Sequence, residues 1–142
     1  MRFVLDTATM VAAIRSNAGA SNRLLVRALE RSLVMLVSTP LLIEYEAVMT
    51  RAEHLAASGL TASDVGNILD AVASVAEPVR LAFHWRPTLR DPDDDMVLET
   101  AVNGRADAIV TLNLRDFVGA TQGFGVEVLA PGKALAKLEA RS

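Results

Sequence analysis

The sequence contains no cysteine among its 142 residues. Disulfides, thiol catalysis and zinc–thiolate sites are therefore excluded, and we expect the reducing cytoplasm to be the compartment of this protein. Long apolar runs are also absent, since none approaches the roughly 18 residues that a membrane span requires. We expect no secretory leader either, because the N-terminal stretch MRFVLD soon reaches an acid. Together these absences favour a soluble protein without a membrane partner.

Lysine is scarce, since Lys133 and Lys137 are the only two among 14 basic residues. Receiver domains and haloacid-dehalogenase-like phosphohydrolases use a lysine after a late strand to pair with phosphate, whereas both lysines fall in the predicted C-terminal helix. A metal-dependent phosphohydrolase or receiver-type domain is therefore the less favoured alternative. A Ser-x-Gly turn suited to a hydrolase triad is missing as well, so we interpret His54 and His84 as surface or packing residues.

Charge does not decide whether the partner is a nucleic acid. The formal net charge is −3, which at first argues against a phosphate backbone as ligand. However, four acids crowd into residues 91–95, and metal ions bound there would leave the remaining surface near neutral or slightly basic. If two copies of the chain pair, we expect the arginines Arg23, Arg27 and Arg31, on one predicted helix, to line a positively charged groove between their two clefts.

Apolar residues make up 51% of the chain, enough for the core of one domain spanning residues 1–142. Short apolar runs alternate with segments of helical spacing, which is typical of a parallel sheet with right-handed crossovers. The predicted strands are 2–6, 33–37, 79–83, 107–112 and 126–129. The predicted helices are 7–15, one opened by Ser21, one opened by Ser38-Thr39-Pro40 that reaches Arg51, one opened by the Thr61/Asp64 capping box, 91–101 and 131–140. The pattern predicts a three-layer α/β/α domain with about five parallel strands.

Five acids occupy positions from which they could converge in that fold. Asp6 ends the first strand and Asp116 follows the last long apolar run, while Glu44, Asp91 and Asp94 lie near helix starts. Ligands of open parallel sheets bind beyond the carboxyl ends of the strands. We therefore expect these acids, with Thr111 and Asn113, to border one cleft.

Clustered carboxylates repel one another unless a cation neutralises them. Oxygen ligands suit Mg²⁺ or Mn²⁺, and a pair of such ions activates water for attack on a phosphodiester. Asp6 is unusual, because an acid at the end of a buried strand is seldom there for solubility, whereas the other four acids also have ordinary structural interpretations. Asp91 and Asp94 favour a helix start, Glu44 is typical of a solvated helical turn, and Asp116 of a loop.

Four segments resemble the signature segments of the PIN domain, in particular its putative toxin subfamily of VapC-like ribonucleases. They are LDTATMVAAIR at 5–15, TPLLIEYEAVMTR at 39–51, RDPDDDMVLETA at 90–101 and VTLNLRDF at 110–117. The resemblance implies a metal-dependent endoribonuclease that cleaves single-stranded RNA, with Mg²⁺ or Mn²⁺ as cofactor. It also implies a type II toxin–antitoxin pair, with an antitoxin protein as partner, and a homodimer.

In that pattern the catalytic and metal-binding acids fall on Asp6, Glu44, Asp94 and Asp116. Asn113 lies in the loop of the last acid, Thr111 and Thr7 are secondary positions, and Asp91 is an extra acid. One residue departs from the family pattern: Ala8 stands where PIN domains usually carry Asn or Ser. In the family, that Asn or Ser holds the first carboxylate or a metal-bound water by a hydrogen bond. Losing this bond weakens metal binding by about ten- to a hundredfold, unless Thr7 or Thr9 compensates. A PIN scaffold that binds RNA or protein without cutting is therefore an alternative.

Overall fold

A computed structural model describes residues 1–82, 92–117 and 119–141 of the chain. Its centre is a five-stranded parallel sheet in the order β3-β2-β1-β4-β5. The strands are β1 (Arg2–Leu5), β2 (Val34–Val37), β3 (Glu77–Pro78), β4 (Ala108–Val110) and β5 (Glu127–Leu129). The helices are α1 (Thr7–Arg15), α2 (Ala20–Leu29), α3 (Thr39–Met49), α4 (Ala52–Ser58), α5 (Ala62–Val75), α6 (Pro92–Asn103) and α7 (Pro131–Ala140), with a 3₁₀ helix, η1 (Leu114–Asp116).

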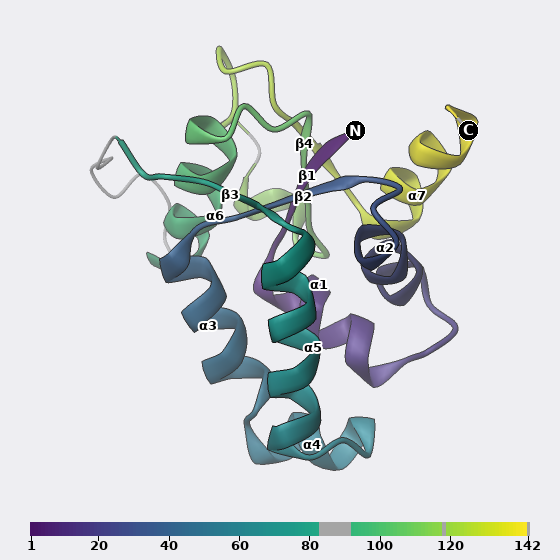
Figure 1. The fold of residues 1–142 in the computed structure, drawn as a ribbon. Coiled ribbons are helices and arrows are strands. Elements are labelled where there is room, and N and C mark those ends of the chain that lie inside the picture. The colour runs from purple at the N-terminus through teal and green to yellow at the C-terminus, as the bar shows by residue number, and fades with distance from the viewer. Residues whose placement is uncertain (83–91, 118, 142) are drawn as a thin grey trace.

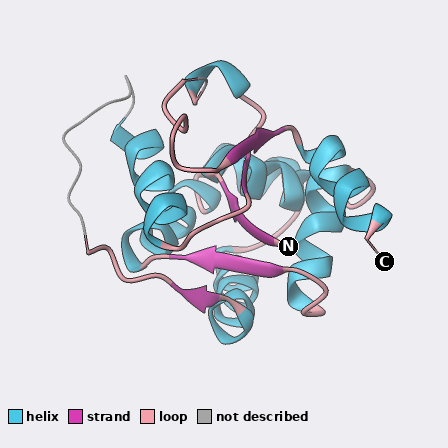
Figure 2. Ribbon diagram, turned by 90° about the horizontal axis from the view of Figure 1, so that it is seen from above, coloured by secondary structure: helices cyan, strands magenta, loops and turns pink. Residues whose placement is uncertain are grey.

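Helices cover both faces of the sheet. On one side α6 contacts β1, β2 and β4, and on the other α2 and α7 pack against each other (Figures 1 and 2). The predicted three-layer α/β/α class with five parallel strands is therefore confirmed. The chain enters a helix soon after β1, β2 and β5, so the residues that follow these strands gather at one edge of the sheet.

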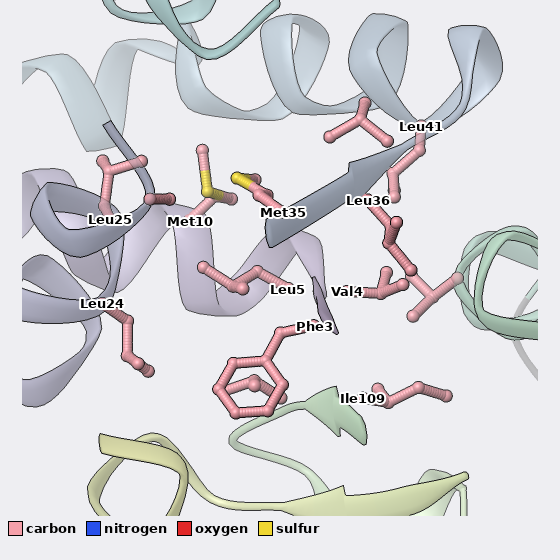
Figure 3. Close-up of a cluster of buried hydrophobic side chains, with 14 of the residues drawn as sticks. Phe3, Val4, Leu5, Met10, Leu24, Leu25, Met35, Leu36, Leu41 and Ile109 are labelled. Atoms are coloured by element: carbon pink, nitrogen blue, oxygen red, sulfur yellow. The ribbon is translucent and has the colours of Figure 1, made fainter. Parts of the chain in front are cut away.

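The core surrounds the central strand β1. Phe3 pairs in register with Met35 of β2 and Ala108 of β4, and Phe3, Val4 and Leu5 have no exposed surface. A strand between two parallel neighbours and two helical layers is apolar on both faces, as the continuous run FVL indicates. Figure 3 shows these side chains packed with Met10 and the leucines of α2.

The predicted strand over residues 79–83 is wrong. The edge strand is instead Glu77–Pro78, and residues 79–82 lie outside any strand, while residue 83 lies outside the described residues. Pro78 is tolerated because it lies on an edge strand, where no further neighbour needs its missing N–H. Just after β3, the Val79 N–H donates a hydrogen bond to Val37 O of β2 at 2.9 Å.

Both ends of α2 also differ from the prediction. Ser21 does not open α2, because the helix starts at Ala20 with Gly19 as its cap, and Ser21 is buried inside it. Arg31 follows the end of α2 in a left-handed conformation with φ 62°, so it does not share a helix with Arg23 and Arg27. In contrast, the caps at Ser38 and at Thr61 with Asp64 are confirmed.

Helix α4 was not predicted. The segment expected to end at Arg51 stops at Met49, and a separate helix follows from Ala52 to Ser58. Gly59 ends α4 with φ 76°, a conformation that glycine adopts without steric cost.

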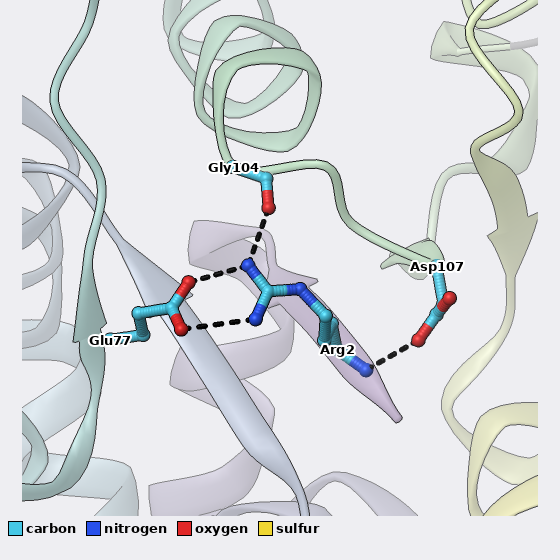
Figure 4. A network of polar contacts seen from close by, with 4 residues as sticks. All are labelled: Arg2, Glu77, Gly104 and Asp107. Carbon is cyan, nitrogen blue, oxygen red and sulfur yellow. Dashed lines mark hydrogen bonds and ion pairs between the residues drawn. The ribbon is translucent and has the colours of Figure 1, made fainter.

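Arg2 ties the amino end of β1 to its surroundings (Figure 4). Its guanidinium donates to both carboxylate oxygens of Glu77, at 3.0 and 2.5 Å, and to Gly104 O at 2.7 Å. The hydrogen bond to Glu77 raises the pKa of Arg2, and the same bond lowers the pKa of Glu77. Gly104 must lack a side chain, since a Cβ there would lie 2.8 Å from a methyl of Val79. These contacts hold β1, β3 and the end of α6 together at the edge away from Asp6.

None of the described helices is both long and apolar enough to cross a membrane.

Candidate functional site

A cleft of about 190 Å³ opens at the carboxyl edge of the sheet. The residues that line it come from four separate parts of the chain. They are Asp6, Thr7 and Ala8 at the start of α1, Glu44, Val48 and Arg51 from α3 and its end, Asp94 and Val97 from α6, and Asn113 and Asp116 from the segment after β4.

Asp6 is the most constrained acid of the cleft. It directly follows β1, caps α1, and is only 4% exposed. Its Oδ1 accepts the Thr9 N–H at 2.8 Å and its Oδ2 accepts the Thr111 hydroxyl at 2.5 Å. A carboxylate oxygen accepts more than one hydrogen bond, so both oxygens retain capacity for a ligand in the cleft.

Thr111 connects Asp6 to the loop after β4. Its Oγ1 accepts the Asn113 N–H at 2.9 Å while donating its own hydrogen to Asp6. The loop then forms η1, where the Asp116 N–H donates to Asn113 O at 3.1 Å. One buried hydroxyl therefore fixes the position of Asp6 relative to Asn113 and Asp116.

Tyr45 supports the same acid from α3. Its hydroxyl donates to Leu5 O, the carbonyl immediately before Asp6, at 2.5 Å. Burial, and to a smaller extent the charge of Asp6, raises the pKa of Tyr45 well above its usual value. The phenol therefore stays protonated and keeps donating at neutral pH. Because Glu44 precedes Tyr45 on α3, this bond also fixes the helix that carries Glu44.

Helix α6 brings Asp94 to the cleft and is linked to α3 by a hydroxyl pair. Thr100 Oγ1 donates to Met96 O at 2.9 Å, so at the 2.7 Å contact with Ser38 it is the serine that donates. Ser38 caps α3. The pair thus couples the helix of Asp94 to the start of the helix of Glu44.

The structure brings most of the predicted site residues to one place. Asp6, Glu44, Asp94, Asp116, Asn113 and Thr7 all line the cleft, and Thr111 lies buried behind Asp6. Asp91 and His84 lie outside the described residues. Arg23 and Arg27 line a different cavity, with Leu135 and Glu139 of α7. Within one chain, therefore, these arginines do not border the carboxylates.

Ala8 places a methyl group in the cleft, at the position where the resemblance leads us to expect Asn or Ser. The two threonines that we considered as replacements act differently. Thr9 contributes its backbone N–H to Asp6, while its hydroxyl donates to Val110 O at 3.2 Å. Thr7 lines the cleft. The second hydrogen bond to Asp6 comes from Thr111 instead.

Sequence reasoning missed two residues of the site, Arg51 and Tyr45. Spacing was a partial signal for Arg51, because Glu44, Val48 and Arg51 follow at intervals of four and three residues. The structure ends α3 at Met49, and Arg51 still lines the cleft from the cap of α4. Tyr45 offered no comparable signal, since a buried tyrosine is common in cores and its partner is a backbone carbonyl far away in sequence.

The donors in the cleft fit a hard divalent cation. They are four carboxylates and one amide, and oxygen ligands of this kind suit Mg²⁺ or Mn²⁺. Among the described residues, no three His, Asp or Glu side chains already lie close enough to hold an ion between them. Mg²⁺ usually takes only one or two carboxylates directly, with water and substrate phosphate completing its shell. A cleft whose acids lie too far apart for three of them to hold one ion is therefore compatible with bound Mg²⁺.

A second cavity of about 450 Å³ adjoins the cleft and shares Asn113 and Asp116 with it. Its other lining residues are Leu112, Leu114 and Arg115, and the two leucines are 53% and 41% exposed. The apolar side chains of two leucines and the positively charged side chain of Arg115 therefore lie beside the carboxylates.

The comparisons with known proteins agree with this architecture. The family model of the PIN domain matches residues 2–115, which is most of the chain, and the chain therefore belongs to the PIN-domain family. Searches of curated proteins and of solved structures each found no match. PIN domains have a nuclease-type fold, generally use divalent metal ions and act on nucleic acid. Asp116 lies just beyond the matched residues, so the family match does not cover it, and its place in the cleft supports its assignment.

Proposed function

We propose that this protein is a Mg²⁺- or Mn²⁺-dependent endoribonuclease that cleaves single-stranded RNA. The observation that carries the proposal is the cleft itself, in which Asp6, Glu44, Asp94 and Asp116 arrive from four separate parts of a PIN-type fold. A protein gains nothing in stability from gathering four acids, because like charges repel. Their common cleft is therefore best explained by a bound cation and the chemistry it supports.

We assign the roles of the acids from how the fold holds each of them in the cleft. Asp6 and Asp94 would hold the ion directly, since Asp6 is held rigidly by Thr9 and Thr111 and Asp94 faces it from α6. Glu44 and Asp116 would hold and orient water molecules, because one is on α3 and the other is exposed on η1. When bound, the ion would activate a water and stabilise the leaving oxygen of the phosphodiester.

Side chains of the cleft would accept the proton and bind the substrate phosphate. During hydrolysis the water oxygen bonds to phosphorus, the bond from phosphorus to the leaving ribose oxygen breaks, and the proton released by the water goes to a carboxylate of the cleft. Glu44 is suited to that role, since α3 holds it through Tyr45 without burying it completely. Asn113, with its amide at the same cleft, can donate to a phosphate oxygen.

The direct test is cleavage of an unstructured RNA oligonucleotide with added Mg²⁺ or Mn²⁺ and with a chelator. We expect cleavage only with metal, and none by Asp6→Asn purified in parallel, which excludes a contaminating ribonuclease. A folded wild-type protein that leaves RNA intact in both metals would contradict the proposal.

A PIN scaffold that binds RNA or protein without cutting is the second candidate. Its support is Ala8, whose methyl group lines the cleft where a hydrogen-bonding side chain is expected. Such a scaffold would bind single-stranded RNA and leave it uncut, with and without metal. The same experiment therefore separates the two candidates.

We further propose that the enzyme is the toxin of a type II pair, VapC-like, cytoplasmic, a homodimer, and a single domain over residues 1–142. The four signature segments support the toxin assignment, and the lack of cysteine supports the compartment. Induced expression should arrest growth, and Asp6→Asn should not. Relief of that arrest by a small protein encoded beside the gene would identify the antitoxin, and light scattering at micromolar concentration would test the dimer.

A further inference from the structure

Arg51 is the one cationic side chain among the described residues that line the carboxylate cleft. It lies where α3 ends and caps the start of α4. Its N–H donates to Val48 O at 3.1 Å, and its carbonyl accepts the N–H groups of His54 and Leu55 at 3.0 and 3.1 Å. The backbone is thus held by three hydrogen bonds, while the side chain is exposed at the cleft.

The guanidinium of Arg51 is not engaged by the acids around it. Within the described part of the chain it forms no ion pair, although four carboxylates line the same cleft. Arg2 shows the contrast, because its guanidinium grips both oxygens of Glu77. An arginine that served to neutralise the cleft would be expected to bond to one of its carboxylates in the same way. Arg51 keeps its five N–H donors for another acceptor.

The formal charge of the cleft indicates what that acceptor is. The four carboxylates among the described lining residues repel a phosphodiester, and two bound divalent cations would cancel their formal charge. Arg51 then adds the positive charge that makes the cleft attractive to an anion. The planar guanidinium matches two oxygens of one phosphate, which a lysine ammonium does not.

We propose that Arg51 binds a backbone phosphate of the single-stranded RNA that enters the cleft. This inference rests on the proposed nuclease function, and it makes Arg51 a substrate-binding residue of the site. Because Arg51 lines the cleft together with Glu44 and Val48, a phosphate bound to it would align the RNA with the acids. A purely structural Arg51 would cap α4 through its backbone and leave RNA affinity unchanged.

The test compares wild type with Arg51→Ala, Arg51→Lys and the control Arg141→Ala. Arg141 is exposed at the end of α7 and does not line the cleft, so its loss removes the same charge elsewhere. Binding of a fluorescent single-stranded RNA is measured by anisotropy in Ca²⁺ at several salt concentrations, and a gel checks that the RNA stays intact. Cleavage in Mn²⁺ and melting temperature are measured on the same samples.

We expect Arg51→Ala to bind about tenfold more weakly, as loss of a hydrogen bond to a charged group predicts. The slope of log affinity against log salt should become shallower by about 0.7, the value for one phosphate contact on a single strand. Arg51→Lys should recover the slope and only part of the affinity, while Arg141→Ala and all melting temperatures stay at the wild-type values.

The outcomes separate this inference from the proposed function. Wild-type cleavage with an unchanged affinity, slope and KM in Arg51→Ala would overturn the role of Arg51 alone. Wild-type binding that depends on Arg51 without any cleavage would support Arg51 and overturn the ribonuclease. Absence of RNA binding by the wild type would overturn both.

Discussion

The hydroxyl of Thr111 donates to Oδ2 of Asp6 at 2.5 Å, joining two residues that are 105 positions apart in sequence. Thr111 directly follows β4 and Asp6 directly follows β1, and these two strands pair in register from Phe3 with Ala108 to Leu5 with Val110. The register of the sheet therefore delivers both side chains to the same point. Thr111 also fixes the position of Asn113, because its hydroxyl oxygen accepts the Asn113 N–H.

Replacing Thr111 by Val should disturb the site more than the fold. The change keeps the shape but leaves a buried carboxylate oxygen with one donor fewer, which should lower the free energy of unfolding by about 1 to 3 kcal/mol. Because Asp6 loses its fixed orientation, we expect cleavage to fall by about ten- to a hundredfold. Thr111→Ser keeps the hydroxyl and is the matched control. Equal rates for the Val and Ser variants would show that this hydrogen bond does not matter.

A matched pair on α3 tests whether the cleft, and not negative charge in general, carries the activity. Glu44 lines the cleft, whereas Glu46 lies two residues further on and is exposed away from it. Glu44→Gln should reduce cleavage by at least about a hundredfold, in line with loss of a general base. Glu46→Gln removes the same charge and should cut RNA at the wild-type rate. Similar losses in both variants would assign the effect to overall charge.

Much of the architecture could be read from sequence because it depends on local patterns. Continuous apolar runs marked β1, β2 and β4, and the capping residues at Ser38 and Thr61 marked helix starts correctly. The edge strand was misplaced because Glu77–Pro78 is polar and short, and its pairing with Leu36 and Val37 is set by the tertiary fold. The cap predicted at Ser21 is wrong, because Ser21 lies buried within α2, which begins at Ala20 with Gly19 as its cap.

The candidate site divides in the same way. The acids could be named because strand ends and helix starts are visible in sequence, and their motif order is that of a known family. The groups that position them were harder to find, since the bonds from Thr111 to Asp6 and from Tyr45 to Leu5 connect residues 105 and 40 positions apart. The placement of Arg51 is likewise set by the tertiary fold, because Arg51 lies beyond the end of α3 and its guanidinium forms no ion pair with the described residues.

Metal binding should be visible as stabilisation of the folded protein. An ion that binds only the folded state adds about 2.7 kcal/mol at a hundred times its dissociation constant, so millimolar Mn²⁺ should raise the melting temperature. Asp6→Asn should lose most of this increase, and without metal it should melt at or above the wild-type temperature, because one of four clustered charges is gone. Asp107→Asn, whose carboxylate bonds the Arg2 N–H at the other edge of the sheet, is the control that should keep the increase. A wild-type melting temperature unmoved by Mn²⁺ would count against a metal site.

Tyr45 should make the protein unstable in alkali. Its pKa is raised in the folded state by burial and by Asp6, whereas in the unfolded chain it returns to about 10. Below pH 10 the phenol is protonated in both states and its contribution to stability is fully present. Above that pH the unfolded state releases the proton first, so the free energy of unfolding should fall by about 1.4 kcal/mol per pH unit until the folded phenol also ionises.

Tyr45→Phe isolates this contribution, because the comparison with wild type cancels the effects of all other groups. At neutral pH the variant should be less stable by about 1 kcal/mol, because Leu5 O loses its donor, and it should cut RNA more slowly if that carbonyl fixes Asp6. Urea unfolding at pH 8.5 and at higher pH should show the stability gap between the two proteins closing. Since Tyr45 is the only tyrosine, tyrosinate absorbance reports it alone, and it should appear in wild type only as the protein unfolds. Ionisation near pH 10 in the folded protein would show that the phenol is not held as the structure indicates.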